Sequence, residues 1–129
     1  MPSFLSPILR EAHYVGVLRN SRNDQILASR LETAFDSRTR RRGLLGRSTF
    51  EEDAALIIAP CSSIHTFFMR MAIDVVFAAR DGRVLKTYST LPAWRIGFAA
   101  GALAAIELPP GTVARSETRR GDVLELAAR

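Results

Sequence analysis

The sequence predicts a mainly β fold, a compact β-barrel or sandwich of about eight short strands with one short helix near residues 37–46. Its 129 residues fit one domain, since domains typically hold roughly 100 to 200 residues. Hydrophobic residues make up 47% and charged residues 24%, a balance that excludes a disordered chain. From residue 54 onward, short apolar segments rich in β-branched residues alternate with turn residues, which favours strands over helices.

The chain is expected to begin with an arm over residues 1–12, followed by a single β-rich domain over residues 13–129. Pro2 and Pro7 are expected to block a helix in the arm, because proline lacks a backbone N–H and clashes with the preceding turn. The domain then opens with a β-hairpin, predicted as a strand over residues 14–18, a polar turn over 20–24 and a return strand over 26–34.

One helix is predicted after this hairpin, over residues 38–45. Asp36 or Ser37 can cap its first turn with a side-chain oxygen, and Gly46 follows where the helix would end. Strands are then predicted over residues 54–59, 64–70, 73–79, 83–90, 102–108 and 123–126, with a hairpin turn at Asp81-Gly82. An α+β arrangement, with the helix packed across one sheet, is the alternative fold.

The positive charge is concentrated at the start of the chain. The formal net charge is +5, and residues 1–50 hold nine arginines against four acidic residues. Arginines suit phosphate and carboxylate because their guanidinium groups donate paired hydrogen bonds. Consecutive helical residues project about 100° apart, however, so the arginines of the predicted helix cannot all face one ligand. A solvated helix is the favoured interpretation, and weak nucleic-acid binding through Arg38–Arg47 is an alternative.

The sequence predicts a cytoplasmic protein that does not associate with membranes. Cys61 is the only cysteine, which excludes an intramolecular disulfide and fits a reducing compartment. Two prolines interrupt the N-terminal segment, which also lacks the basic leader of a signal peptide. The longest weakly apolar stretch, residues 96–106, is short of the roughly 20 residues that span a bilayer.

Cys61 and His65 could form a thiolate–base pair or supply two metal ligands. On an extended strand they would lie about 13 Å apart, so a direct pair would require a turn between them. A metal site would also need a third ligand, such as Asp74 or Glu107. We therefore predict a structural thiol at Cys61, no metal and no other cofactor.

Asp74 and Glu107 each interrupt an apolar β-type run. Each carboxylate either faces solvent or, in a core strand, needs donors that offset its desolvation. Arg70 is the nearest candidate partner for Asp74. Trp94 lies in a loop beside Arg95, where it could cover a pocket, stack on a ligand or fold back over the end of the barrel.

Several segments from Arg42 onward resemble, in the same order, a bacterial and archaeal family known as domain of unknown function 192. These segments are Arg42–Arg47, Pro60–Arg70, Ile73–Phe77, Asp81–Val84, Leu108–Gly111 and Gly121-Asp122. The resemblance covers residues 25–127 and implies a small, mainly β domain without an established biochemical activity. It also implies six positions to test: His65, Thr66, Met69, Arg70, Asp74 and Glu107.

The favoured functional hypothesis is a non-enzymatic ligand-binding or accessory protein, because the sequence contains no common catalytic or phosphate-binding motif. Its partner would be a small molecule or another protein, and nucleic acid is not expected. A metal-assisted or acid–base enzyme that uses His65, Asp74 and Glu107 is the alternative from another class. The predicted ligand pocket consists of His65, Arg70, Asp74, Trp94 and Glu107.

Overall fold

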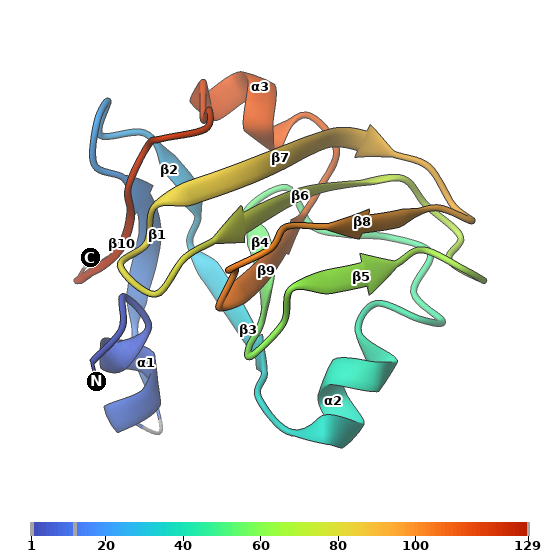
Figure 1. Ribbon diagram of the computed structural model, residues 1–129, viewed down its shortest axis with the longest axis horizontal. Coiled ribbons are helices and arrows are strands. Elements are labelled where there is room, and N and C mark those ends of the chain that lie inside the picture. Colours follow the sequence, from blue (N-terminus) through green and yellow to red (C-terminus); the bar gives the residue numbers. More distant parts are fainter. Residues whose placement is uncertain (1, 12, 129) are drawn as a thin grey trace.

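Ten strands and three short helices make up residues 2–11 and 13–128, the part of the chain that the computed structural model describes (Figure 1). The strands form three sheets. A three-stranded sheet has the order β10 (Leu124–Ala128), β1 (Gly16–Asn20), β2 (Ile26–Ala28). A five-stranded sheet has the order β3 (Arg30–Ala34), β4 (Ala54–Ile58), β9 (Ala104–Leu108), β6 (Ile73–Ala78), β7 (Val84–Leu91). β5 (Ser63–His65) and β8 (Ile96–Phe98) form the third.

The mainly β prediction is confirmed, but the predicted barrel is not, because no sheet of the described residues closes on itself. The five-stranded sheet carries the core, and β4, β6 and β9 are buried along their whole length. Side chains alternate along a strand, so each of these strands feeds two apolar clusters on opposite faces. On β9, Ile106 and Leu108 belong to one cluster and Ala105 to the other.

The predicted first hairpin is confirmed as the antiparallel pair β1–β2. The return strand predicted over residues 26–34 is split, however. The backbone N–H groups of Ser29 and Arg30 both donate to the carbonyl of Asp53, and the chain leaves β2 there to start β3 in another sheet. The predicted Asp81-Gly82 turn is also confirmed, with Gly82 at a φ of 90°.

The predicted helix is confirmed as α2 (Ser37–Arg42), and Asp36 caps it by accepting from the Thr39 N–H at 2.8 Å. It ends earlier than expected, because Gly43 rather than Gly46 leaves the helical conformation, at a φ of 48°.

Two further short helices were not predicted. α1 (Ser6–Arg10) overturns the expectation that Pro7 blocks a helix in the arm. Pro7 lies in the first turn, where the N–H that proline lacks has no partner within the helix. α3 (Thr112–Ser116) follows the Pro109-Pro110-Gly111 turn.

The strand predicted over residues 64–70 is wrong beyond residue 65. The Thr66 hydroxyl donates to the Pro92 carbonyl at 2.6 Å and accepts from the Arg95 N–H at 2.8 Å, which ties the chain into a turn. Phe68, at a φ of 65°, continues that turn. None of the described helices is long and apolar enough to cross a membrane.

Candidate ligand-binding site

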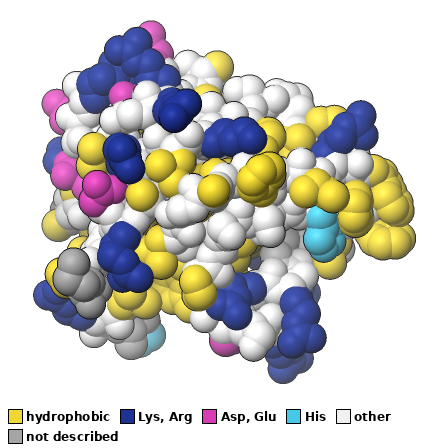
Figure 2. Space-filling model, in the orientation of Figure 1, with side chains coloured by type: hydrophobic (Ala, Val, Ile, Leu, Met, Phe, Trp, Pro, Cys, Tyr) yellow, Lys and Arg dark blue, Asp and Glu magenta, His cyan; other side chains and the backbone are white. Residues whose placement is uncertain are grey.

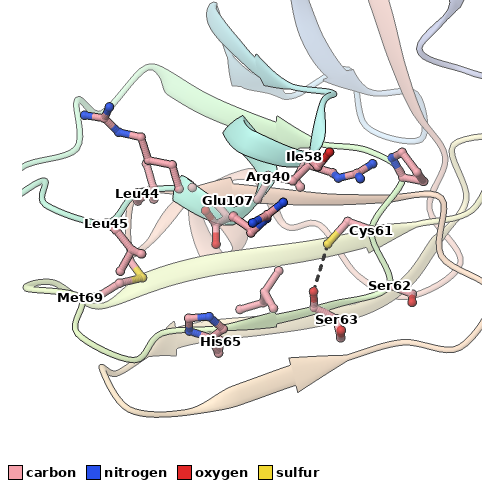
Figure 3. A pocket seen from close by; sticks show the side chains of 16 residues that line it. Arg40, Leu44, Leu45, Ile58, Cys61, Ser62, Ser63, His65, Met69 and Glu107 are labelled. Carbon is pink, nitrogen blue, oxygen red and sulfur yellow. Dashed lines mark hydrogen bonds between the residues drawn. The ribbon is translucent and has the colours of Figure 1, made fainter.

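A pocket of about 490 Å³ lies between α2 and β5. In Figure 1, β5 lies between β8 on one side and α2 on the other, so the edge of β5 that does not pair with β8 faces the helix. Figure 3 shows how Arg40, Cys61, Ser63, His65, Met69 and Glu107 surround the space. Apolar walls come from Leu44, Leu45, Ile58, Ile64 and Met69.

Glu107 forms the floor of this pocket. It lies on β9, the middle strand of the large sheet, opposite Leu56 on β4 and Val75 on β6. The residue is only 3% exposed, and no described group hydrogen-bonds its Oε1. A Cβ added to Gly43 would stand 3.7 Å from Oε1, so the end of α2 passes close to the carboxyl group.

Burial raises the pKa of Glu107 to about 7, against a smaller opposing effect of the Arg47 charge. Arg47 does not pair with Glu107, because Glu32 holds its guanidinium with hydrogen bonds of 2.8 and 2.9 Å. A desolvated carboxyl group that lacks a charged partner binds its proton more tightly. Near neutral pH, Glu107 can therefore either donate or accept a hydrogen bond toward the pocket.

Arg40 and Cys61 lie at the rim. The Cys61 thiol donates to the Ser63 carbonyl at 3.0 Å. Burial raises the pKa of this thiol, and the nearby Arg40 charge opposes the rise. A raised pKa disfavours the thiolate, which is the reactive form of cysteine, and the structural role of Cys61 stays a prediction.

His65 lies at the mouth of the pocket, next to a cluster of aromatic side chains outside it that consists of Phe67, Phe68 and Trp94. Its Nδ1 accepts from the Phe67 N–H at 3.3 Å, and its ring stacks on that of Phe67 at 5.0 Å. Trp94 packs in turn against Phe67 and Phe68, at 5.7 and 4.6 Å between ring centroids. Phe67 and Phe68 lie in the loop after β5, and Trp94 lies in the loop between β7 and β8. Figure 2 shows hydrophobic side chains protruding at the end of the molecule where these two loops lie. Trp94 does not line the pocket and is 55% exposed.

Asp74 lies on the opposite face of the sheet from Glu107. It pairs with Leu108 in the register of β6 and β9, one residue out of step with Glu107. Its carboxylate accepts three backbone N–H groups, from Thr90 at 2.8 Å, Gly111 at 3.1 Å and Val113 at 2.8 Å. These bonds tie the start of α3 to the sheet, so Asp74 is structural.

The structure therefore separates the five predicted pocket residues. Glu107 and His65 line one pocket, whereas Asp74, Arg70 and Trp94 do not. Arg70 is exposed and forms no ion pair with Asp74 among the described residues, so the predicted pairing is wrong. Of the other positions that the family resemblance implied, Met69 lines the pocket and Thr66 fixes the adjoining turn.

Arg40 and the edge of β5 belong to the site but were not predicted. The sequence named Arg40 only as one of the arginines of the predicted helix, and helical spacing could not single it out, because Leu44, four residues further on, lies beyond the end of α2. No signal marks the β5 edge either. Within residues 2–11 and 13–128, no three His, Cys, Asp or Glu side chains are grouped so that they could hold a metal ion.

Comparison with known proteins supports the fold. The family model DUF192, described as "Uncharacterized ACR", matches residues 18–126. A protein of unknown function from Novosphingobium aromaticivorans DSM 12444 aligns with a TM-score of 0.74 at 21% identity, over 86% of this chain and 83% of that one. A chain from Sinorhizobium meliloti 1021, named "a putative transcription regulator", has the same TM-score and identity over 86% of this chain and 91% of its own. No curated protein matches the sequence.

Proposed function

The chain belongs to the DUF192 family, and we propose that it is a non-enzymatic ligand-binding module whose ligand occupies the pocket between α2 and β5. The observation that carries this proposal is the Glu107 carboxyl group, which is buried with an unpartnered Oε1 at the floor of an open pocket. Leaving a buried polar atom unpaired costs free energy, so such atoms are uncommon unless a ligand or water pairs with them.

The composition of the pocket indicates the chemistry of the ligand. Leu44, Ile58 and Met69 offer apolar contacts, and ligand sites typically combine such walls with a few convergent polar groups. Arg40 at the rim suits an anionic group, because its guanidinium can donate two parallel hydrogen bonds. A ligand with an apolar body, an anionic group and one hydrogen-bonding group for Glu107 would satisfy all three features.

The same contacts argue against the acid–base alternative that combines His65, Asp74 and Glu107. Asp74 faces the other side of the sheet, where backbone N–H groups occupy both of its oxygens. His65 already accepts from the Phe67 N–H through Nδ1. Among the described residues no hydrogen bond joins His65, Cys61 and Glu107, so no positioned nucleophile–base pair supports catalysis.

The proposal is tested by NMR titration of the ¹⁵N-labelled protein with small carboxylates, phosphate monoesters and primary amines that carry apolar tails. At least one of these classes should shift the amides of Leu44 and Ile64 at millimolar concentration. Glu107→Leu, which keeps the volume but removes the hydrogen-bonding group, should weaken that binding at least tenfold. The exposed Glu52 provides a matched control, and Glu52→Leu should leave the affinity unchanged. The proposal would be contradicted if none of the three classes shifted these amides, or if Glu107→Leu bound the ligand as tightly as the wild type.

Nucleic-acid binding by the arginines of α2 is expected to be feeble. The helix has only six residues. Arg40, Arg41 and Arg42 all line the pocket, so the expectation that consecutive arginines cannot face one ligand is wrong for these three, and they border a small cavity instead of an extended basic surface. Each phosphate contact would lower the logarithm of affinity by roughly 0.9 per unit of the logarithm of salt concentration. We therefore expect no binding of a labelled DNA duplex at about 150 mM salt in fluorescence anisotropy. Micromolar binding that is lost when Arg40, Arg41 and Arg42 are changed to Ser would reverse this conclusion.

A further inference from the structure

Within the described part of the chain β5 pairs with β8 alone, and its other edge borders the pocket. Four consecutive residues, Ser62 to His65, all line the space, although alternate side chains of a strand point to opposite faces. A strand can contribute consecutive residues to one cavity when the cavity lies along its edge. Figure 3 agrees, since Ser62, Ser63 and His65 border the same space.

The hydrogen-bond pattern determines which backbone groups that edge offers. The Ala99 N–H donates to the Ser62 carbonyl, and the Thr66 N–H donates to the Arg95 carbonyl. Every second residue of an antiparallel strand bonds to the same neighbour, so the N–H and C=O groups of Ser63 and His65 point away from β8.

Phe98, on the partner strand, bears out this alternation. It pairs with Ser63, and its N–H and carbonyl both bond the Tyr88 hydroxyl on the side of β8 away from β5. Among the described residues, the N–H of Ser63 and both backbone groups of His65 have no backbone partner on this free edge. The Ser63 carbonyl already accepts from the Cys61 thiol, so a further strand would bond to its second lone pair.

We infer that the ligand of this pocket is an extended peptide segment with a free C-terminal carboxylate, which adds to the edge of β5 as an antiparallel strand. The inference rests on the proposed function and specifies its ligand class. Main-chain hydrogen bonds to Ser63 and His65 would supply affinity, as in other cases where a peptide extends a sheet edge. Side chains that point from the peptide toward the sheet would contact Met69 and Ile58.

The position of Arg40 determines the direction of the peptide. Arg40 and Cys61 line the same part of the pocket, as Figure 3 shows, and Cys61 lies two residues before β5 begins, so the guanidinium lies near the N-terminal end of that strand. An antiparallel strand would end at that point, and its terminal carboxylate would meet Arg40. Arg41 and Arg42 also line the pocket and add to its positive charge.

The experiment uses two pools of acetylated pentapeptides with randomised apolar residues, one ending in a free carboxylate and the other in an amide. Each pool is titrated into the ¹⁵N-labelled full chain and followed by NMR. The free-acid pool should shift the Ser63 and His65 amides and bind at least tenfold more tightly than the amidated pool. Arg40→Gln should abolish that difference. Arg38→Gln is the matched control, since Arg38 lies on the same helix but does not line the pocket, and it should preserve the difference.

Equal affinity for the two pools would overturn the inference, as would binding that leaves the Ser63 and His65 amides unshifted. A response to the small carboxylates, phosphates or amines with none to the peptides would reject the peptide while the proposed ligand-binding function stands. Silence from both sets would contradict both. Light scattering tests whether a second copy of the chain occupies the edge of β5 instead of a peptide. A dimer whose formation shifts the Ser63 amide would show that it does, and would overturn the inference.

Discussion

The free energy of unfolding of the wild-type protein is expected to fall by ~3 kcal/mol between pH 4.5 and 7 through Glu107 alone, and Glu107→Gln is expected to remove that fall. The magnitude follows from the rise in the pKa of Glu107 from 4.5 to about 7, since one pKa unit corresponds to ~1.4 kcal/mol.

The direction of the effect follows from proton binding. The folded state holds the Glu107 proton more tightly than the unfolded state, so between the two pKa values folding takes up a proton. Stability is therefore highest, as far as this group is concerned, below pH 4.5, and it is lost as pH rises through about 7. Asp122 behaves in the opposite way: its pKa is lowered to about 2, despite the raising effect of burial, by hydrogen bonds from Arg22 and Asn20. Its contribution disappears only in acid below this window.

Urea denaturation of wild type, Glu107→Gln and Glu52→Gln at several pH values measures this effect. Wild type and the exposed control Glu52→Gln should share the loss of stability between pH 4.5 and 7. Over the same pH range, Glu107→Gln should lose ~3 kcal/mol less of its free energy of unfolding than the wild type loses. Parallel curves for all three proteins would show that Glu107 is not desolvated in the folded state.

The sequence was sufficient to single out Glu107 and Asp74, but not to place them. Both interrupt apolar runs, and a charged residue in such a run indicates either an exposed position or a buried one with a special role. Whether the two side chains share a face depends on the register between β6 and β9, which are distant in sequence. Because a shift of one residue reverses the face, the sequence alone could not show that only Glu107 reaches the pocket.

Local signals predicted most elements that depend on local chemistry. The Asp36 cap, the Asp81-Gly82 turn and the apolar strands of the large sheet were all predicted close to their observed positions. Some of the elements that were missed depend on distant contacts, whereas α1 was missed because Pro7 was expected to block a helix. Thr66 holds the turn that ends β5 and the segment that leads into β8. Its hydroxyl bonds to Pro92 and Arg95, which follow it in the sequence by 26 and 29 residues. α3 has five residues, too few for a hydrophobic period to reveal it.

Asp74→Ala is expected to destabilise the protein by about 3–5 kcal/mol, the cost of removing one partner from a buried, charge-assisted cluster. The sequence suggested Arg70 as the partner, but the structure gives a different reason. The carboxylate is fully buried and accepts the N–H groups of Thr90, Gly111 and Val113. Alanine would leave these three donors without their acceptor, in a region where water cannot easily replace it. It would also release the start of α3 and the end of β7 from the sheet.

Two matched variants separate this mechanism from the one that the sequence suggested. Asp81→Ala removes an aspartate from an exposed turn, where its carboxylate accepts the Arg83 N–H, and should change stability by less than about 1 kcal/mol. Arg70→Ala should lie within about 0.5 kcal/mol of wild type, because Arg70 is exposed and no ion pair joins it to Asp74 among the residues that the structure describes. Denaturant midpoints and slopes measured for the three variants decide between the two mechanisms. If Arg70→Ala were as destabilising as Asp74→Ala, an ion pair between the two residues would be the better explanation, and equal midpoints for Asp74→Ala and Asp81→Ala would contradict a structural role for Asp74.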